Sequence, residues 1–177
     1  MEDLILKIYK DKEFISIIEN IINNETVQKM KNFRQHYNVS CFEHCLCVSY
    51  YSYLICKKLK LDYKSVARAG MLHDLFLYNW RKRENNRKGL HAFTHPKTAL
   101  DNSLKLFDLN KKEKDIILKH MWPVTIMPPK YLESLIITFV DKHCAMQETF
   151  NSIFKIWSKK TLFRYAYVFL CLLIIKF

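Results

Sequence analysis

The sequence predicts an all-α protein that forms a single domain. Its 177 residues leave room for one core of ordinary size. Half of the residues are apolar, which excludes a disordered or collagen-like chain. Only two glycines and four prolines are present, whereas a sandwich or barrel needs turn residues about every 8–12 positions. We therefore expect a bundle of helices.

Short helices are expected in the N-terminal region, residues 1–39, before the core. Two apolar faces with helical spacing mark them: Phe14, Ile17, Ile18, Ile21 and Ile22, then Val27, Met30 and Phe33. An irregular stretch follows around residues 36–39. Ser40 and Glu43 then form a capping box, because each side chain can bond the backbone N–H of the other residue. A long helix is expected from there to about Leu59.

The next core helix begins at Asp62, whose side chain can cap it. Small and apolar residues at positions 66, 67, 70 and 71 form its buried face, and the helix leads to the adjacent pair His73-Asp74. The periodicity then fails. Residues 81–89 are expected to form a polar, strongly basic loop.

Two more helices follow the basic loop. Thr94 and Pro96 suit the start of the first, because a proline in the first turn removes only an amide that would be unpaired anyway. Asn110 with Glu113 is a second cap-and-Glu start. That helix leads to His120 and ends before a proline.

The last core helix is expected over residues 131–149, where it presents Asp141. Its predicted buried residues are Leu132, Leu135, Ile136, Phe139 and Val140. Phe154 and Trp157 indicate one more helix. No repeat or linker divides the chain, so we expect a core of about residues 40–148 within a single domain of residues 1–177.

The C-terminus, about residues 161–177, is expected to form an apolar helix. Its apolar run of eleven residues, 165–175, is shorter than the roughly twenty needed to span a bilayer. A buried terminal helix is therefore the first interpretation, and no membrane span is expected. An interfacial or oligomer contact, or a true membrane segment, remains an alternative.

The net charge favours an anionic partner. Lys and Arg number 29 against 17 Asp and Glu, a formal charge of +12, which suits nucleic acid, nucleotides, other phosphates or an acidic membrane surface. The six cysteines include no CxxC pair and show no disulfide framework. The N-terminus carries acidic residues where a signal peptide needs basic ones. These features predict a cytoplasmic protein.

Histidines and aspartates carry the chemical signal. The set is His44, His73, Asp74, His95, His120 and Asp141. These positions fall at the ends of, or within, separate expected helices. A helix rises about 1.5 Å per residue, so the helix from position 44 climbs roughly 22 Å and the next one returns about 15 Å to position 73. Converging imidazoles and carboxylates suit divalent metals, and two ions about 3.5–4 Å apart can polarise phosphorus and activate water.

A family resemblance rests on this spacing. His44, then His73-Asp74 twenty-nine residues later, then Asp141, resembles the H…HD…D signature of the HD-domain metal-dependent phosphohydrolase superfamily. The resemblance covers about residues 40–148. It implies an HD-domain helical bundle with a central metal site, in which these four residues bind one metal ion.

The two later histidines extend the resemblance. His95 and His120 resemble the additional histidines of members that hold two metals, and Asp74 would then bridge the two ions. Histidine-rich ligation favours Fe or Mn over Mg, which prefers oxygen ligands, and Zn or another divalent ion remains open. We therefore expect one or two divalent metal ions as the cofactor.

The subfamily is less defined. His120 is followed by Met121-Trp122-Pro123, not by the GYP segment of members that cleave cyclic di-GMP. The size and the spaced histidines resemble small stand-alone bacterial HD hydrolases, including those that split symmetrical dinucleoside tetraphosphates. The segment HPKTAL differs from their His-Gly segment, and no His-Thr-Thr-Gly follows.

Basic residues near the ligands are the predicted substrate-binding groups, because Arg offers a bidentate fork to phosphate. Those of the loop are Arg81, Arg83, Arg87 and Lys88. Solvated surface is the alternative for this loop. His91 is either a metal ligand or substrate contact, or a loop residue that caps the following helix.

Two residues are the predicted catalytic groups. Asp74 would orient the attacking water and accept its proton. Lys142 follows Asp141, points about 100° away from it on a helix, and would stand beside the metal cluster. The leading hypothesis is an HD-type metal-dependent phosphohydrolase, a phosphatase or phosphodiesterase acting on a nucleotide or another small phosphorylated metabolite. The alternative is a non-catalytic module that binds nucleic acid or nucleotides and retains a vestigial HD site.

Overall fold

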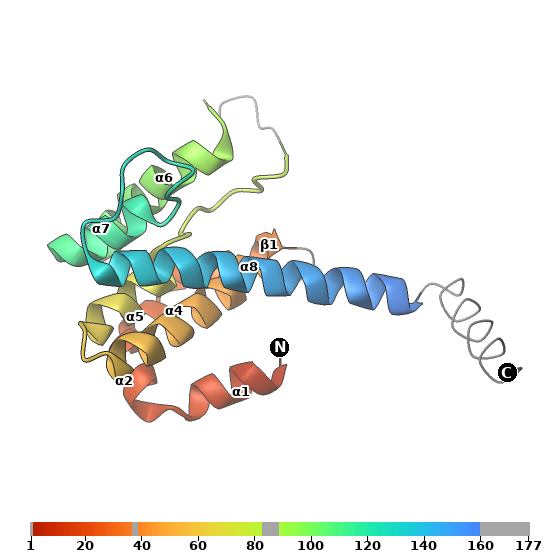
Figure 1. Cartoon of the computed structure of the whole chain (residues 1–177), viewed down its shortest axis with the longest axis horizontal. Helices are drawn as coiled ribbons and strands as arrows, with labels where there is room; N and C mark the ends of the chain where they lie inside the picture. Colours follow the sequence, from red (N-terminus) through yellow and green to blue (C-terminus); the bar gives the residue numbers. More distant parts are fainter. Residues whose placement is uncertain (1, 37–38, 83–88, 160–177) are drawn as a thin grey trace, which may run out of the picture.

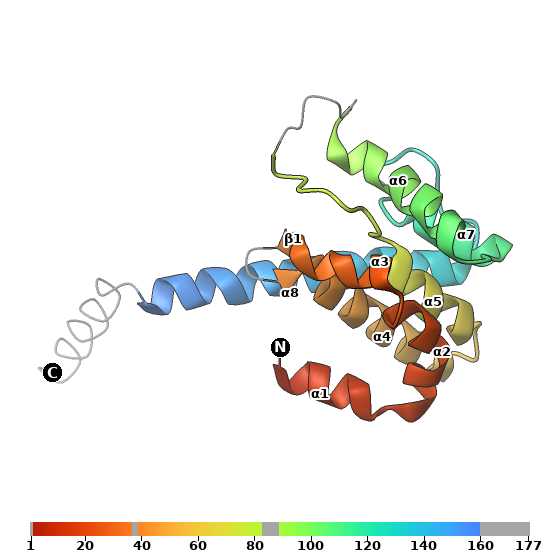
Figure 2. The same cartoon turned by 180° about the vertical axis from the view of Figure 1, so that it is seen from behind.

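Helix α8 (Leu132–Lys159) is the element about which the other helices are arranged. The computed structural model describes residues 2–36, 39–82 and 89–159. Helices α6 (His91–Leu106) and α7 (Lys111–Lys119) lie on one side of α8, and α4 (Cys41–Lys58) and α5 (Tyr63–Leu72) lie on the other (Figures 1 and 2). The predicted all-α fold is confirmed.

The N-terminal elements cover the α4–α5 pair. They are α1 (Glu2–Lys10), α2 (Lys12–Ile22), α3 (Glu25–Gln28) and the 3₁₀ helix η1 (Lys29–Asn32). Helix α2 packs on α5, and η1 packs on α4. Helix α1 was not predicted. Its Ile8 is fully buried, and its Leu4 packs partly buried against the core.

Side-chain caps fix the starts of the core helices, as the sequence predicts. Ser40 Oγ accepts from the Glu43 N–H at 3.2 Å, and the Glu43 carboxylate accepts from the Ser40 N–H at 2.9 Å. Asn110 and Glu113 form the same reciprocal pair at α7. Asp62 caps α5. These caps satisfy amide donors that a helix leaves unpaired at its first turn.

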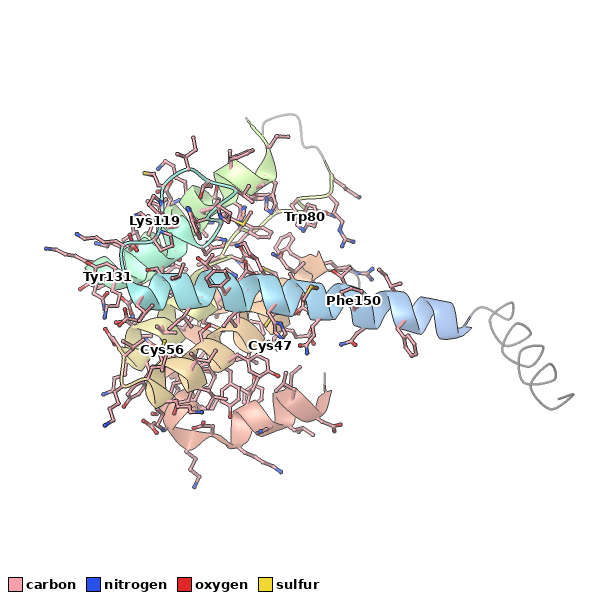
Figure 3. The ribbon with its side chains drawn as sticks, in the orientation of Figure 1. Cys47, Cys56, Trp80, Lys119, Tyr131 and Phe150 are labelled. Atoms are coloured by element: carbon pink, nitrogen blue, oxygen red, sulfur yellow. The ribbon has the colours of Figure 1, made fainter. Side chains whose placement is uncertain are left out.

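A short hairpin occupies the stretch that the sequence left irregular. Strand β1 (Arg34–His36) pairs with β2 (Val39–Ser40) in antiparallel fashion. The Trp80 indole N–H donates to the Arg34 carbonyl at 3.2 Å, and the Cys41 N–H donates to the Phe33 carbonyl at 2.8 Å. Figure 3 shows Trp80 in the segment after α5, beside this hairpin. These two bonds connect the hairpin to α4, which carries His44, and to the segment that follows His73 and Asp74.

The start of α6 differs from the prediction. The helix begins at His91, three residues before Thr94, and Pro96 lies inside it. The N–H groups of Phe93 and Thr94 both donate to the Leu90 carbonyl, so the first turn is closed before the proline is reached. His91 is therefore a helix residue and not a loop residue.

Helix α8 also differs from the prediction, because it continues without a break to Lys159. Phe154 thus belongs to α8 and not to a separate helix. Leu132 and Phe139 are 54% and 59% exposed, although both were expected to be buried. Ile137 is buried in their place. Since α8 packs on α4 and α7 together, its buried face includes small polar residues that apolar periodicity does not mark.

Close packing of α4 on α5 forms the centre of the core. A Cβ added at Gly70 of α5 would lie 2.7 Å from the Ser49 Cα of α4, so only glycine allows this approach. The cysteines of the described residues are buried free thiols: Cys41, Cys45, Cys47, Cys56 and Cys144. They fill the core as small apolar side chains.

Two expectations concern the ends of the molecule. Among the residues that the structure describes, no helix has both the length and the apolar character needed to cross a membrane. The predicted apolar helix over residues 161–177 lies outside the described residues.

Candidate metal centre

Five helices bring all six predicted ligands into one buried cluster. His44 lies in the first turns of α4, His73 ends α5 and Asp74 follows it, and His120 ends α7. His95 and Asp141 lie within α6 and α8. The exposed fraction of each residue is 9% or less. Such burial of charged groups is costly unless they pair or bind a metal.

A first group consists of His44, His73 and Asp141. Oδ1 of Asp141 lies 3.0 Å from Nε2 of His44 and 3.6 Å from Nε2 of His73. Ligand atoms of the three residues all lie within 4.8 Å of one another. The geometry could hold one metal ion.

A second group consists of Asp74, His95 and His120. Oδ1 of Asp74 lies 3.1 Å from Nε2 of His95 and 3.5 Å from Nε2 of His120. Its other oxygen, Oδ2, lies 3.5 Å from Nε2 of His73, which belongs to the first group. The Asp74 carboxylate therefore lies between the two groups.

Each of the four histidines has its Nδ1 engaged by an acceptor. The partners are the carbonyls of Gly70 for His73, His91 for His95 and Ile117 for His120, each at 2.8 Å, and the Glu148 carboxylate for His44 at 3.0 Å. A carbonyl oxygen can only accept, so Nδ1 carries a hydrogen, and in the neutral form of these three rings Nε2 presents a lone pair. In metal sites, a hydrogen bond from the second ring nitrogen to such an acceptor fixes the orientation and tautomer of a histidine ligand.

Unpaired atoms at the centre fit a divalent cation. Nε2 of His95 and Nε2 of His120 lie 2.9 Å apart. Because both Nδ1 atoms are donors, two lone pairs face each other there when both rings are neutral, as metal ligation requires. Among the described residues, His73 Nε2 and Asp74 Oδ1 are buried without a hydrogen-bond partner. A metal ion would satisfy all of these atoms, so the residues fit the predicted cofactor.

The charges of the cluster also suit a cation. Burial alone would raise the pKa values of Asp74 and Asp141, but the neighbouring histidines outweigh it and hold both pKa values well below the usual range. Burial alone would lower the pKa of His44, yet hydrogen bonds to Asp141 and Glu148 raise it well above its usual value. The two carboxylates thus require a positive charge at this position, from a proton or from a metal.

A cavity of about 310 Å³ opens onto the second group. Its lining includes Asp74, His95, His120, Asp141 and Lys142. Trp80, Met121 and Val124 contribute apolar surface. A small organic molecule could therefore reach the metal ligands.

Two of the other predicted site residues reach this cavity. The Lys142 Nζ donates to the carbonyls of His120 and Thr138 at 3.1 and 3.3 Å, and burial lowers its pKa. The ring of His91 stacks on His95, with centroids 4.4 Å apart, and on Trp80 at 5.3 Å. His91 therefore packs against the predicted ligand His95 and also lines the cavity.

The basic loop is only partly described. Arg81 is exposed, and its guanidinium lies 5.3 Å from the centre of the Trp80 ring. Arg81 does not belong to the described residues that line the cavity. Arg83, Arg87 and Lys88 lie outside the described residues.

Three residues at the site were not predicted. Glu148 accepts from His44, Gln35 donates to Asp74, and Trp80 packs on His91. Glu148 follows Asp141 by seven residues, which is two helical turns, so its position on the same face could have been foreseen. Gln35 lies on a short strand and had no such signal.

No protein-family model, curated protein or solved structure matches the chain.

Proposed function

We propose that this chain is a metal-dependent phosphohydrolase of the HD type that cleaves a phosphate ester or anhydride bond. Its substrate would be a nucleotide or another small phosphorylated metabolite. The observation that carries the proposal is the buried cluster of four imidazoles and two aspartates, with each histidine Nδ1 engaged by an acceptor. Four imidazoles favour Fe or Mn over Mg as the resident ion.

The chain's own residues would divide the work as follows. Divalent ions held by the cluster would supply Lewis acidity and activate water. Asp74 remains ionised, because its pKa is held well below the usual range, and its carboxylate would orient an attacking water by accepting a hydrogen bond from it. Lys142 lines the cavity, and carbonyls accept from two of the three N–H donors of its ammonium. Its third donor would bind a phosphoryl oxygen.

The cavity walls support a small substrate. Met121, Val124 and Ala145 line it together with the ligands. Apolar walls exclude water and strengthen the electrostatic interactions at the reacting phosphate. The formal charge of +12 would attract such an anion to the molecule.

The test combines metal analysis with a screen for phosphate release. The full chain, purified without chelator, should contain Fe or Mn and release phosphate from a nucleotide, dinucleotide or phosphomonoester. Asp74→Asn should abolish turnover. The matched control is Asp101→Asn, because Asp101 is an exposed residue of α6 that pairs with Lys97, and this variant should keep full activity.

Two results would count against the proposal. Metal-loaded protein that turns over none of these substrates would overturn it, and retained activity in Asp74→Asn would overturn the assignment of the site. Nucleic-acid binding that weakens steeply with salt, without any turnover, would favour the alternative of a binding module.

A further inference from the structure

Gln35 is the buried polar side chain that touches the metal cluster from outside the helical bundle. It lies on β1 and is 8% exposed. Its amide Nε2 donates to Oδ2 of Asp74. Because a carboxylate only accepts hydrogen bonds, the amide nitrogen and not the amide oxygen must face Asp74. The orientation of the Gln35 amide is therefore determined.

Two backbone contacts made by the residues just before Gln35 hold its strand in place. The Arg34 carbonyl accepts a hydrogen bond from the Trp80 indole N–H, and the Phe33 carbonyl accepts one from the Cys41 N–H. The Cys41 thiol in turn donates to the Asp74 carbonyl at 3.2 Å. The hairpin and the backbone of Asp74 thus share one network, which keeps the Gln35 amide at the carboxylate.

The hydrogen bond from Gln35 makes the two carboxylate oxygens of Asp74 inequivalent. Oδ2 receives the amide and lies on the side of His73. Oδ1 has no hydrogen-bond partner among the described residues and lies on the side of His95. A carboxylate that rotated freely could turn both oxygens to one group, and Gln35 opposes that rotation.

We propose that Gln35 is a positioning residue for a second metal ion: by holding Oδ2 of Asp74 it presents Oδ1 to the second group. The inference rests on the proposed metal-dependent function and deepens it. It states that binding of the second ion depends on a residue that is not itself a metal ligand. Groups that orient metal ligands through a hydrogen bond typically change metal affinity by about 10–100-fold when they are removed.

The experiment measures binding of Mn²⁺ to the metal-free full chain by equilibrium dialysis. The wild type should bind two ions. Gln35→Met, which has similar volume but no amide, should bind one ion with unchanged affinity and the other about 10–100-fold more weakly. Gln35→Asn keeps the amide on a shorter side chain and should show the same selective loss. It serves as the second variant if Gln35→Met does not fold.

A matched control and a double-mutant cycle identify the ion that is affected. Gln28 also donates one side-chain hydrogen bond, to the Ile22 carbonyl, away from the cavity, so Gln28→Met should bind both ions as the wild type does. Combining Gln35→Met with His120→Ala should cause no further loss, because both changes act on the same ion. Combining it with His44→Ala should weaken both ions.

The outcomes separate this inference from the proposed function. Equal loss of both ions in the Gln35 variants, or no loss of either, would overturn the inference, as would a wild type that binds a single ion. Phosphate release is measured in parallel. Two ions with selective loss but no turnover by the wild type would support the inference and overturn the proposed function. Turnover with an unchanged second ion in Gln35→Met would overturn the inference alone.

Discussion

Glu148 of α8 accepts a hydrogen bond from the Nδ1 of His44 on α4, at 3.0 Å to each carboxylate oxygen. The contact joins residues 104 positions apart in the chain. Glu148 is 4% exposed, and it leaves the Nε2 of His44 to face Asp141. One buried carboxylate therefore both orients a ligand and links α4 to α8, the helices that carry His44 and Asp141 of the first group.

Truncating Glu148 should weaken metal binding. We expect Glu148→Ala to lower metal affinity by about 10–100-fold, because His44 loses the partner that orients its ring. Glu148→Gln keeps an acceptor oxygen and should restore most of the affinity. Isothermal titration with Mn²⁺ measures both variants, with Gln147→Ala on the exposed side of α8 as the control. Unchanged affinity in Glu148→Ala would contradict the role given to this residue.

Removing metal should lower the stability of the fold. The native state holds the Nε2 atoms of His95 and His120 only 2.9 Å apart, so a metal that binds both atoms binds the folded chain and not the unfolded one. A divalent ion at 100 times its dissociation constant adds about 2.7 kcal/mol to the free energy of unfolding. That corresponds to roughly 5–10 °C in melting temperature for a chain of this size.

Differential scanning fluorimetry with EDTA and with added Mn²⁺ measures this shift. His120→Ala should respond less to either addition than the wild type. A melting temperature that is the same with chelator and with metal would show that no ion binds the native cluster.

Loss of the Lys142 ammonium should slow turnover. We expect Lys142→Ala to reduce kcat by about 10²–10³-fold, the usual effect of removing one group that stabilises charge in the transition state. Metal content should stay at the wild-type value, because Lys142 is not a ligand. The control is Lys97→Ala, since Lys97 is an exposed residue of α6. A loss of metal equal to the loss of activity would instead indicate a structural role for Lys142.

A methyl group at Gly70 should destabilise the protein. Its Cβ would lie 2.7 Å from the Ser49 backbone, so α4 and α5 would have to separate. We expect Gly70→Ala to lower the free energy of unfolding by about 1–3 kcal/mol. Urea denaturation measures the change. The variant should also bind metal more weakly, because the Gly70 carbonyl holds the His73 Nδ1. Wild-type stability would show that the two helices are not closely packed here.

Asp115 should make stability depend on pH in the acid range. Its carboxylate accepts from the Lys130 N–H at 2.9 Å and the Ser134 hydroxyl at 2.8 Å, and it pairs with Lys119. Burial alone would raise the pKa of Asp115, but these contacts outweigh it and lower the pKa. A carboxyl whose pKa is lowered in the folded state stabilises the fold above its unfolded value of about 3.9. That stabilisation is lost as the pH falls through the folded-state pKa.

The variant Asp115→Asn measures this contribution. It should be less stable than the wild type at pH 7, and the difference should shrink as the pH falls below about 4. Melting temperatures from pH 2.5 to pH 7 provide the comparison. A difference that stays constant over this range would mean that the Asp115 carboxylate does not stabilise the fold through its charge.

Local rules predicted the helices whose ends are set by neighbouring residues. The capping boxes at Ser40 and Asn110 and the cap at Asp62 were identified correctly, because each involves residues within four positions of one another. The start of α6 was placed three residues late, since the first turn closes on Leu90 without a side-chain cap.

By itself the sequence determined the helical fold class and the six residues whose side chains gather at the centre. Apolar spacing, caps and the histidine pattern are all written along the chain. Only the tertiary structure decided which atoms face one another: the Oδ1 and Oδ2 sides of Asp74, the Glu148 partner of His44, and the placing of Gln35 on a strand. These contacts join segments distant in sequence, and their geometry depends on how the helices and the hairpin pack, which no local pattern encodes.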